Sequence, residues 1–179
     1  MLSRQTQNLR HQSKLFALIF KIILFGLPLS SAVFWSFFNH LPDGFHDQLP
    51  VKVATILPTS TLIWAFIVSS MPLAVMMYAT ASLVRLFSLY EAGVFFATEN
   101  INCYRKLGIS LIALFFAKIL FNGLLSIVLS FANPPGQRML VFGFGSSDLM
   151  ILCTGAIVIL VSSVMEEAAR LEQEQALTV

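Results

Sequence analysis

The chain carries very little charge for its length. Only 11% of its 179 residues are Asp, Glu, Lys or Arg, whereas soluble domains average about 25%. A soluble core of this size would need a far more polar surface to keep its apolar residues from water. The low charge therefore excludes an ordinary soluble domain. The net charge of +2 provides no cationic surface for nucleic acid.

Catalytic motifs are also absent. The sequence has no nucleophile elbow, no His-Glu-x-x-His motif, no Walker loop and no dinucleotide-binding glycine pattern. It has two cysteines, Cys103 and Cys153, and neither has the neighbours of a thiol–metal site. We therefore expect a protein that is not an enzyme and that uses no cofactor.

Metal-binding residue types gather only in the first loop after the first apolar segment. This loop contains His40, Asp43, His46 and Asp47, whose side chains can bind divalent cations. No Cys or third His completes a ligand set, and Asp43 is part of a turn signal between a proline and a glycine. No metal site is predicted.

Long apolar segments dominate what the chain does contain. Hydrophobic residues make up 57% of the sequence, and they cluster in segments at about 15–38, 62–87, 107–131 and 149–165. At a rise of 1.5 Å per residue, about 20 apolar residues cross a hydrocarbon core of ~30 Å. We predict an all-α integral membrane protein, a four-helix bundle in one domain over residues 1–179, with the lipid bilayer as its main contact.

Basic residues are concentrated on one side of this layout. Three precede the first segment and three lie near the connector between the second and third, whereas the other two loops have one each: Arg4, Arg10, Lys14; Arg85, Arg105, Lys106; Lys52; Arg138. By the positive-inside rule, both termini, the connector 88–106 (the elbow) and the tail 166–179 are predicted to be cytoplasmic. The two cysteines then lie near opposite membrane faces, so no disulfide is expected.

The first apolar segment also has the basic head and small residues of a cleavable signal peptide. However, the apolar run continues past Ser30 and Ala32 to Trp35, which suits an anchor at the membrane interface. A retained helix is therefore favoured over a cleaved one.

Helix ends are marked in the elbow. Gly93 can adopt the left-handed conformation that terminates a helix, so the second helix should continue to about Ala92. Thr98 is expected to cap the next helix. Glu99 then lies in the first turn, where a carboxylate suits the helix dipole. A hydroxyl among residues 59–61 could cap the second helix in the same way.

Lys118 is the most costly residue to place. It lies near the centre of the third segment, where a lysine costs roughly 2.5–3.5 kcal/mol on insertion scales. Asn122, four residues on, is the nearest candidate partner, and Asp148 is a more distant one. Two interpretations stay open: a polar cavity that attracts an anion, or a lysine that snorkels or binds carbonyls freed by Pro28 or Pro72.

Lys21 lies only a short way into the first segment from its cytoplasmic end. Its side chain could reach the interface, or a glutamate at position 91, 166 or 167. Snorkelling to the interface is the favoured interpretation.

The elbow and the tail carry a recognisable pattern. It consists of Leu86-Phe87, Leu89-Tyr90-Glu91-Ala92-Gly93-Val94-Phe95-Phe96, Glu99-Asn100, Arg105-Lys106-Leu107-Gly108, Glu166-Glu167 and the terminal Leu177-Thr178-Val179. This pattern resembles domain-of-unknown-function family 2975, small four-span proteins of the bacterial inner membrane. Members are often encoded beside a small helix-turn-helix regulator. The resemblance therefore implies a soluble cytoplasmic partner of that kind.

Three functions follow from these features. The first is a non-enzymatic partner or regulator of a small cytoplasmic protein, which would bind the elbow and the tail through Glu91, Glu99, Arg105, Leu171 and Leu177. The second is a small transporter or channel component with a polar site at Lys118; Asn122 and Lys21 are further candidate binding residues. The third is a structural subunit of a membrane complex, in which the chain could also associate with itself.

Overall fold

In a computed structural model, the chain is built from four long helices. The structure describes residues 2–42, 56–95, 97–131 and 138–176. Its elements are α1 (Leu2–Phe37), the short 3-10 helix η1 (Phe38–His40), α3 (Thr59–Glu91), α4 (Thr98–Ser130) and α5 (Ser146–Ala176). Each long helix contains a stretch long and apolar enough to cross a membrane, and the described residues include no strand. The prediction of an all-α protein with four spans is confirmed.

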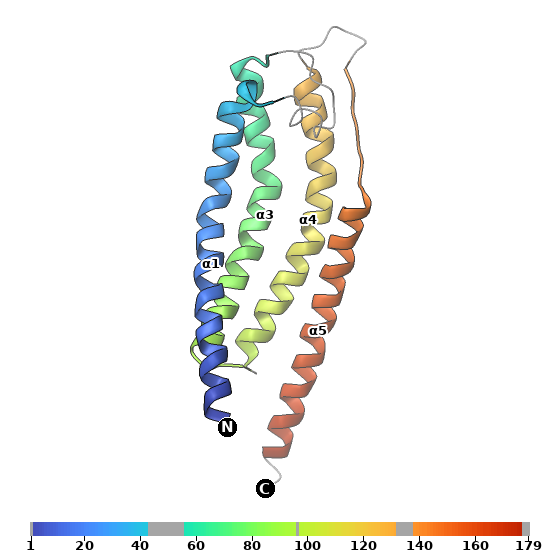
Figure 1. Cartoon of the computed structure of the whole chain (residues 1–179). Helices are drawn as coiled ribbons and strands as arrows, with labels where there is room; N and C mark the ends of the chain where they lie inside the picture. The colour runs from blue at the N-terminus through green and yellow to red at the C-terminus, as the bar shows by residue number, and fades with distance from the viewer. Residues whose placement is uncertain (1, 43–55, 96, 132–137, 177–179) are drawn as a thin grey trace.

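The long helices pack in chain order. α1 packs on α3, α3 on α4, and α4 on α5, so the bundle is a row with α1 and α5 at its two ends (Figure 1). In the most apolar stretch of each helix, 33% of the α4 residues are buried but only 6% of the α1 residues. Most of α1 is therefore left to lipid, whereas α4 is the helix around which the protein core forms.

The four helices have two ends along their axes, and the end that carries η1 (the η1 end) holds the main hydrophobic cluster. Its buried members come from α1, η1, α3, α4 and the segment before α3: Trp35, Phe38, Leu57, Ala65, Leu125 and Leu129. Trp35 is only 5% exposed, and its Nε1 donates a hydrogen bond to Ser69 Oγ at 2.9 Å. Trp35 is thus a core residue that joins α1 to α3, a burial that the sequence did not predict.

The opposite end of the helices, where the elbow joins α3 to α4 (the elbow end), is held together by aromatic packing and a tight turn. Phe87 of α3 stacks on Phe16 and Phe20 of α1, with ring centroids 5.2 and 5.5 Å apart. α3 ends at Glu91, and Gly93 has a φ of +83°. The N–H groups of Gly93 and Val94 donate to carbonyls in the last turn of α3, each at 3.0 Å. This is the Schellman arrangement, and it confirms the predicted helix end at Gly93.

The predicted hydroxyl caps are wrong. α4 begins at Thr98 itself, with Ala97 in the capping position, and α3 begins at Thr59 after Pro58. Neither start has a side-chain cap. A threonine that is already inside the first turn cannot place its hydroxyl to accept from the N–H groups that a capping residue serves. Glu99 does lie in the first turn of α4, as predicted.

α4 and α5 approach each other closely at two glycines. A Cβ on Gly108 would lie 2.9 Å from the carbonyl oxygen of Gly155 and 2.6 Å from Ile159 Cγ1. Both glycines are buried. Small residues let transmembrane helices pack backbone to backbone, so this contact depends on the absence of side chains.

Adding one methyl group should distinguish this contact from an ordinary helical glycine. Gly108→Ala should lower the free energy of unfolding by about 1–3 kcal/mol, because the backbone of α5 must move. Gly26→Ala is the matched control, because nothing lies within 4 Å of its Cβ position in α1. It should be neutral or stabilising by up to about 1 kcal/mol. Denaturant titration in detergent measures both, and equal effects would contradict the close packing.

Candidate functional site

Four polar residues occur at every fourth position along one face of α4. Lys118, Asn122, Ser126 and Ser130, which we call the polar ladder, face the non-helical segment 138–145 that leads into α5. In Figure 1 this segment runs from the η1 end of α4 down beside the helix, and α5 begins well below that end. Irregular backbone therefore lies beside the apolar part of α4.

The ladder binds alternate residues of this segment. Ser130 Oγ accepts from the N–H of Met139 and donates to its C=O, both at 3.2 Å. Ser126 Oγ accepts from the N–H of Val141 at 2.9 Å. Asn122 Nδ2 donates to the carbonyl of Gly143 at 3.1 Å.

This spacing has a simple geometric cause. Two residues of extended chain rise about 6.6 Å and four residues of α-helix rise 6.0 Å. Because the two rises nearly match, a polar group on each helical turn meets a backbone group on every second residue. Extended backbone at membrane depth is tolerated only where protein satisfies its polar groups, and the ladder does this on one edge of the segment.

An ion pair forms the lowest rung of the ladder. Lys118 Nζ donates to Asp148 Oδ1, and Asp148 Oδ2 accepts from the N–H of Gly145 at 2.9 Å. The Asp148 side chain is only 9% exposed, and the residue lies in the first turn of α5. Asp148 is thus both the counter-ion of Lys118 and the acceptor that holds the start of α5. Asn122, the nearer expected partner, binds Gly143.

The pair lies far from both ends of α4. Lys118 is twelve residues from Lys106, the basic residue just before the third apolar segment, and twelve from Ser130, the last residue of α4. Each distance is about 18 Å along the helix. A charge at such a depth is expensive in lipid and is normally paired. The second charge comes from a residue thirty positions away, so neither helix alone reveals the pair.

Aromatic packing covers the same segment. The ring of Phe142 lies on Gly123, where any side chain would collide with it. Phe144 makes an edge-to-face contact with Phe115 at a centroid distance of 6.0 Å. A glycine opposite an aromatic ring lets the segment lie close to α4.

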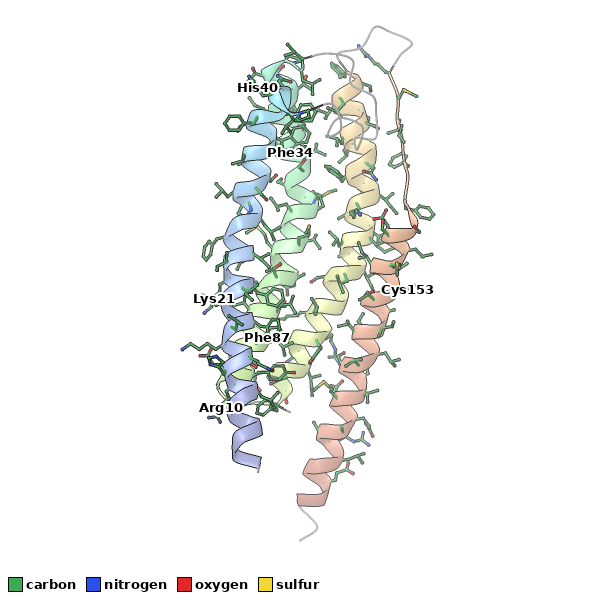
Figure 2. All side chains as sticks on the ribbon, in the orientation of Figure 1. Arg10, Lys21, Phe34, His40, Phe87 and Cys153 are labelled. Atoms are coloured by element: carbon green, nitrogen blue, oxygen red, sulfur yellow. The ribbon has the colours of Figure 1, made fainter. Side chains whose placement is uncertain are left out.

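The predicted elbow residues do not join this site. Glu91 and Glu99 are exposed and, among the described residues, form no ion pair. Lys21 is exposed on α1 (Figure 2), and it pairs with none of its expected glutamates in the part of the chain that the structure describes. These three residues lie apart from Lys118 and Asn122.

Arg105 has a definite partner. Its Nη2 lies 2.6 Å from Glu166 Oε2, so this ion pair joins α4 to α5 at the elbow end. Leu171, farther along α5, is 48% exposed. Leu177 lies outside the described residues.

The other elbow motif residues hold the turn together. The hydroxyls of Tyr90 and Tyr104 are 2.9 Å apart, and Phe95 stacks on Tyr90 at 5.6 Å. Asn100 is fully buried, and its Nδ2 donates to the carbonyl of Val94 at 3.0 Å. Sequence reasoning missed this arrangement, although two tyrosines and an asparagine close together in a polar connector were a usable signal.

The metal and thiol predictions have different outcomes. Asp43, His46 and Asp47 lie outside the described residues; His40 is exposed. Within the described ranges, no three His, Cys, Asp or Glu residues are placed to hold a metal ion. Both cysteines are free, Cys103 buried and Cys153 exposed. Their predicted placement near opposite membrane faces is wrong, because Cys153 lies well away from the η1 end (Figure 2), two residues from Gly155, which packs against Gly108 of α4.

Comparison with known proteins adds one match. A family described as "Protein of unknown function (DUF2975)" matches residues 15–179. No curated protein and no solved structure matches the chain.

The ion pair can be tested by a double-mutant cycle. Lys118→Met leaves Asp148 charged and unpaired, so it should lower the free energy of unfolding by roughly 2.5–3.5 kcal/mol. Adding Asp148→Asn removes that charge but keeps an oxygen for the N–H of Gly145, so most of the loss should be recovered. Denaturant titration in detergent gives the coupling. Additivity of the two changes to within about 0.5 kcal/mol would show that the pair is not coupled.

Proposed function

This chain belongs to the DUF2975 family of proteins of unknown function, and we propose that it is a non-enzymatic, multi-pass protein of a bacterial inner membrane that binds a small cytoplasmic protein at its elbow end. The partner implied by the family resemblance is a helix-turn-helix regulator. One observation carries the proposal: α5 continues as a helix to Ala176, ten residues beyond the Arg105–Glu166 pair. A projection of about 15 Å is more than a membrane span needs.

An exposed apolar face of α5 continues onto its projecting part. Val164, just before the projection, and Ala168 and Leu171, within it, are all exposed and lie at spacings of four and three residues, as in helices that bind in a partner's groove. Gly155 and Ser162, which are buried, occupy the opposite face of the helix, toward α4. The apolar face is therefore directed away from this chain's own core.

The charge of α5 from Glu166 onward suits a basic partner, because residues 166–176 contain four glutamates and one arginine. Glu99 is exposed at the start of α4, and Glu167 and Glu174 flank Arg170 on α5 at 3.3 and 3.4 Å. DNA-binding domains carry basic surfaces. A partner bound here would have part of its basic surface covered by α5. Binding to this chain would therefore compete with binding to DNA.

Capture of a small helix-turn-helix regulator, the class of partner that the family resemblance implies, tests the proposal. The two proteins are co-expressed, extracted in mild detergent and co-purified. Leu171→Ala should weaken capture about tenfold, as for an apolar residue at the centre of an interface. Arg170→Ala is the matched control: it removes two exposed ion pairs but keeps Leu171, and should change capture by no more than about twofold. Undiminished capture after Leu171→Ala and after deletion of residues 171–179 would reject this binding site.

A second function, transport, is favoured by the Lys118–Asp148 pair at mid-depth, because paired charges inside a membrane often mark ion or proton pathways. The variant with Lys118→Met and Asp148→Asn separates transport from a structural role, because it removes both charges and keeps Asn122, Ser126 and Ser130 of the ladder. Proton and chloride flux into proteoliposomes should fall to that of empty vesicles in this variant. Flux equal to wild type, or no wild-type flux above empty vesicles, would leave the pair with a structural role in a membrane complex.

A further inference from the structure

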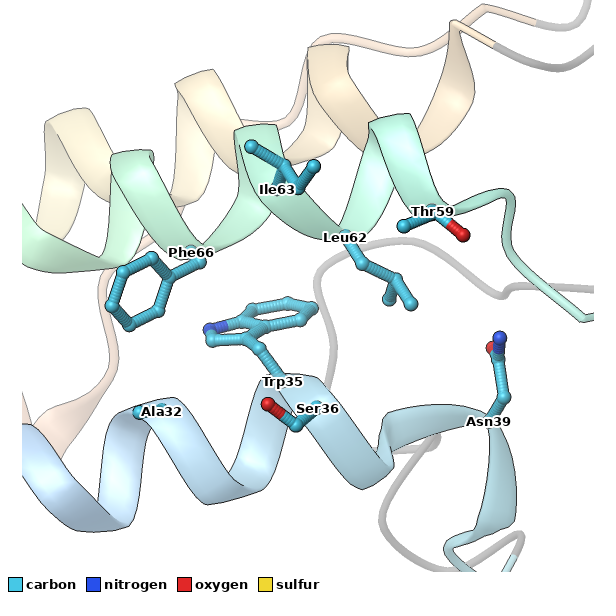
Figure 3. Close-up of a pocket in the computed structure, with 8 residues that line it drawn as sticks. All are labelled: Ala32, Trp35, Ser36, Asn39, Thr59, Leu62, Ile63 and Phe66. Carbon is cyan, nitrogen blue, oxygen red and sulfur yellow. The ribbon is translucent and has the colours of Figure 1, made fainter.

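A groove of about 510 Å³ lies between α1 and α3 at the η1 end (Figure 3). Trp35 from α1 and Leu62, Ile63 and Phe66 from α3 form its apolar walls, with Ala32 at one end. Its size is within the range of small-ligand sites, about 300–1,000 Å³. Ile63 is 55% exposed and Phe66 is 37% exposed, so the groove opens sideways, toward the lipid.

Polarity changes along the groove in the same direction on both walls. Asn39 and Thr59 lie at one end, whereas Ala32 and Phe66 lie at the other (Figure 3). Seven residues separate the two ends on each helix, or about 10 Å. Among the described residues that line the groove, none is charged. The site therefore suits a ligand with an oxygen-rich end and an uncharged apolar chain.

The groove is already shaped without a ligand. Trp35 is held by its hydrogen bond to Ser69 at 2.9 Å. The Asn39 side chain makes two hydrogen bonds of 3.0 Å with the backbone of Leu57. The hydroxyls of Ser36 and Thr59, in contrast, have no partner among the described residues. They are available to donate hydrogen bonds at the polar end.

The depth of the groove matches one leaflet of a bilayer. Trp35 is twenty-one residues from Lys14, the last basic residue before the first span. This is about 32 Å of helix, close to the ~30 Å thickness of the hydrocarbon core. The polar end thus lies at the membrane boundary farther from the elbow, and the apolar end lies below it.

We infer that this groove binds one acyl chain of a phospholipid from the leaflet farther from the elbow. The chain would lie against Trp35 and Phe66. The hydroxyls of Ser36 and Thr59 would donate hydrogen bonds to its ester carbonyl oxygens, which occupy the boundary between headgroups and hydrocarbon. Because the described lining of the groove is uncharged, binding should depend on the chain and the ester and not on the charge of the headgroup.

Quenching of tryptophan fluorescence by brominated acyl chains can detect this lipid. The sequence has two tryptophans, so Trp64→Phe leaves Trp35 as the single reporter. This protein is placed in nanodiscs that contain increasing fractions of phosphatidylglycerol or phosphatidylethanolamine with brominated chains. Quenching should saturate at a low fraction of brominated lipid, and equally for both headgroups.

Two groups of variants separate a specific site from general lipid contact. Ala32→Phe fills the apolar end, and the fraction for half-quenching should rise about fourfold or more, the change expected when one methylene loses its contact. Val33→Phe is the matched control, because Val33 is 49% exposed and does not line the groove. The half-quenching fraction of this variant should equal that of the protein with Trp64→Phe alone. Ser36→Ala with Thr59→Val adds no bulk and should also raise the half-quenching fraction.

Three outcomes would overturn the inference. Quenching could rise in proportion to the bulk lipid fraction and be identical in all variants, which means general lipid contact only. Quenching could differ between the two headgroups, which means that charge governs binding. Trp35 could be unquenched at every fraction, which means that another helix or a second copy covers the groove.

Discussion

The need to satisfy backbone hydrogen bonds away from water controls this structure. In a helix every interior polar group of the backbone is satisfied locally, but segment 138–145 is not helical and runs beside the apolar part of α4. The polar ladder resolves this conflict on the side that faces α4. Because Asp148 completes the ladder, the start of α5 is set by a residue of α4, and α5 is displaced toward the elbow end.

That displacement has consequences at the opposite end. α5 crosses α4 at Gly108 and Gly155, is tied to it again by Arg105 and Glu166, and then extends beyond the elbow. A fourth helix of the same length that began level with the η1 end of α4 would end closer to the level of the elbow and would project less beyond it. The exposed face around Leu171 therefore follows from the ion pair at mid-depth, and the site in the membrane and the surface beyond it are parts of one geometric arrangement.

The η1 end and the elbow end differ in the chemistry that they expose. At the η1 end, α1 and α3 enclose a groove whose polarity matches a lipid leaflet. At the elbow end, charged and apolar side chains of α4 and α5 are exposed. The Tyr90–Tyr104 and Asn100–Val94 contacts fix α4, and the Arg105–Glu166 pair ties α5 to it. A row of helices, unlike a closed bundle, leaves both faces accessible, so the proposed lipid and the proposed protein partner would occupy opposite ends of the same small chain.

Much of this was readable from residues close together in sequence. The four spans follow from local hydropathy, and the helix end at Gly93 follows from the conformational freedom of a single glycine. The spacing of residues 118, 122, 126 and 130 was also visible, although its meaning was not. The row order, the burial of Trp35 and the pairing of Lys118 with Asp148 were decided by tertiary structure. The pair joins residues thirty positions apart, and it requires the extended segment between them to lie in register with α4. No local propensity encodes that register, because it arises from the match between the rise of an extended chain and the rise of a helix.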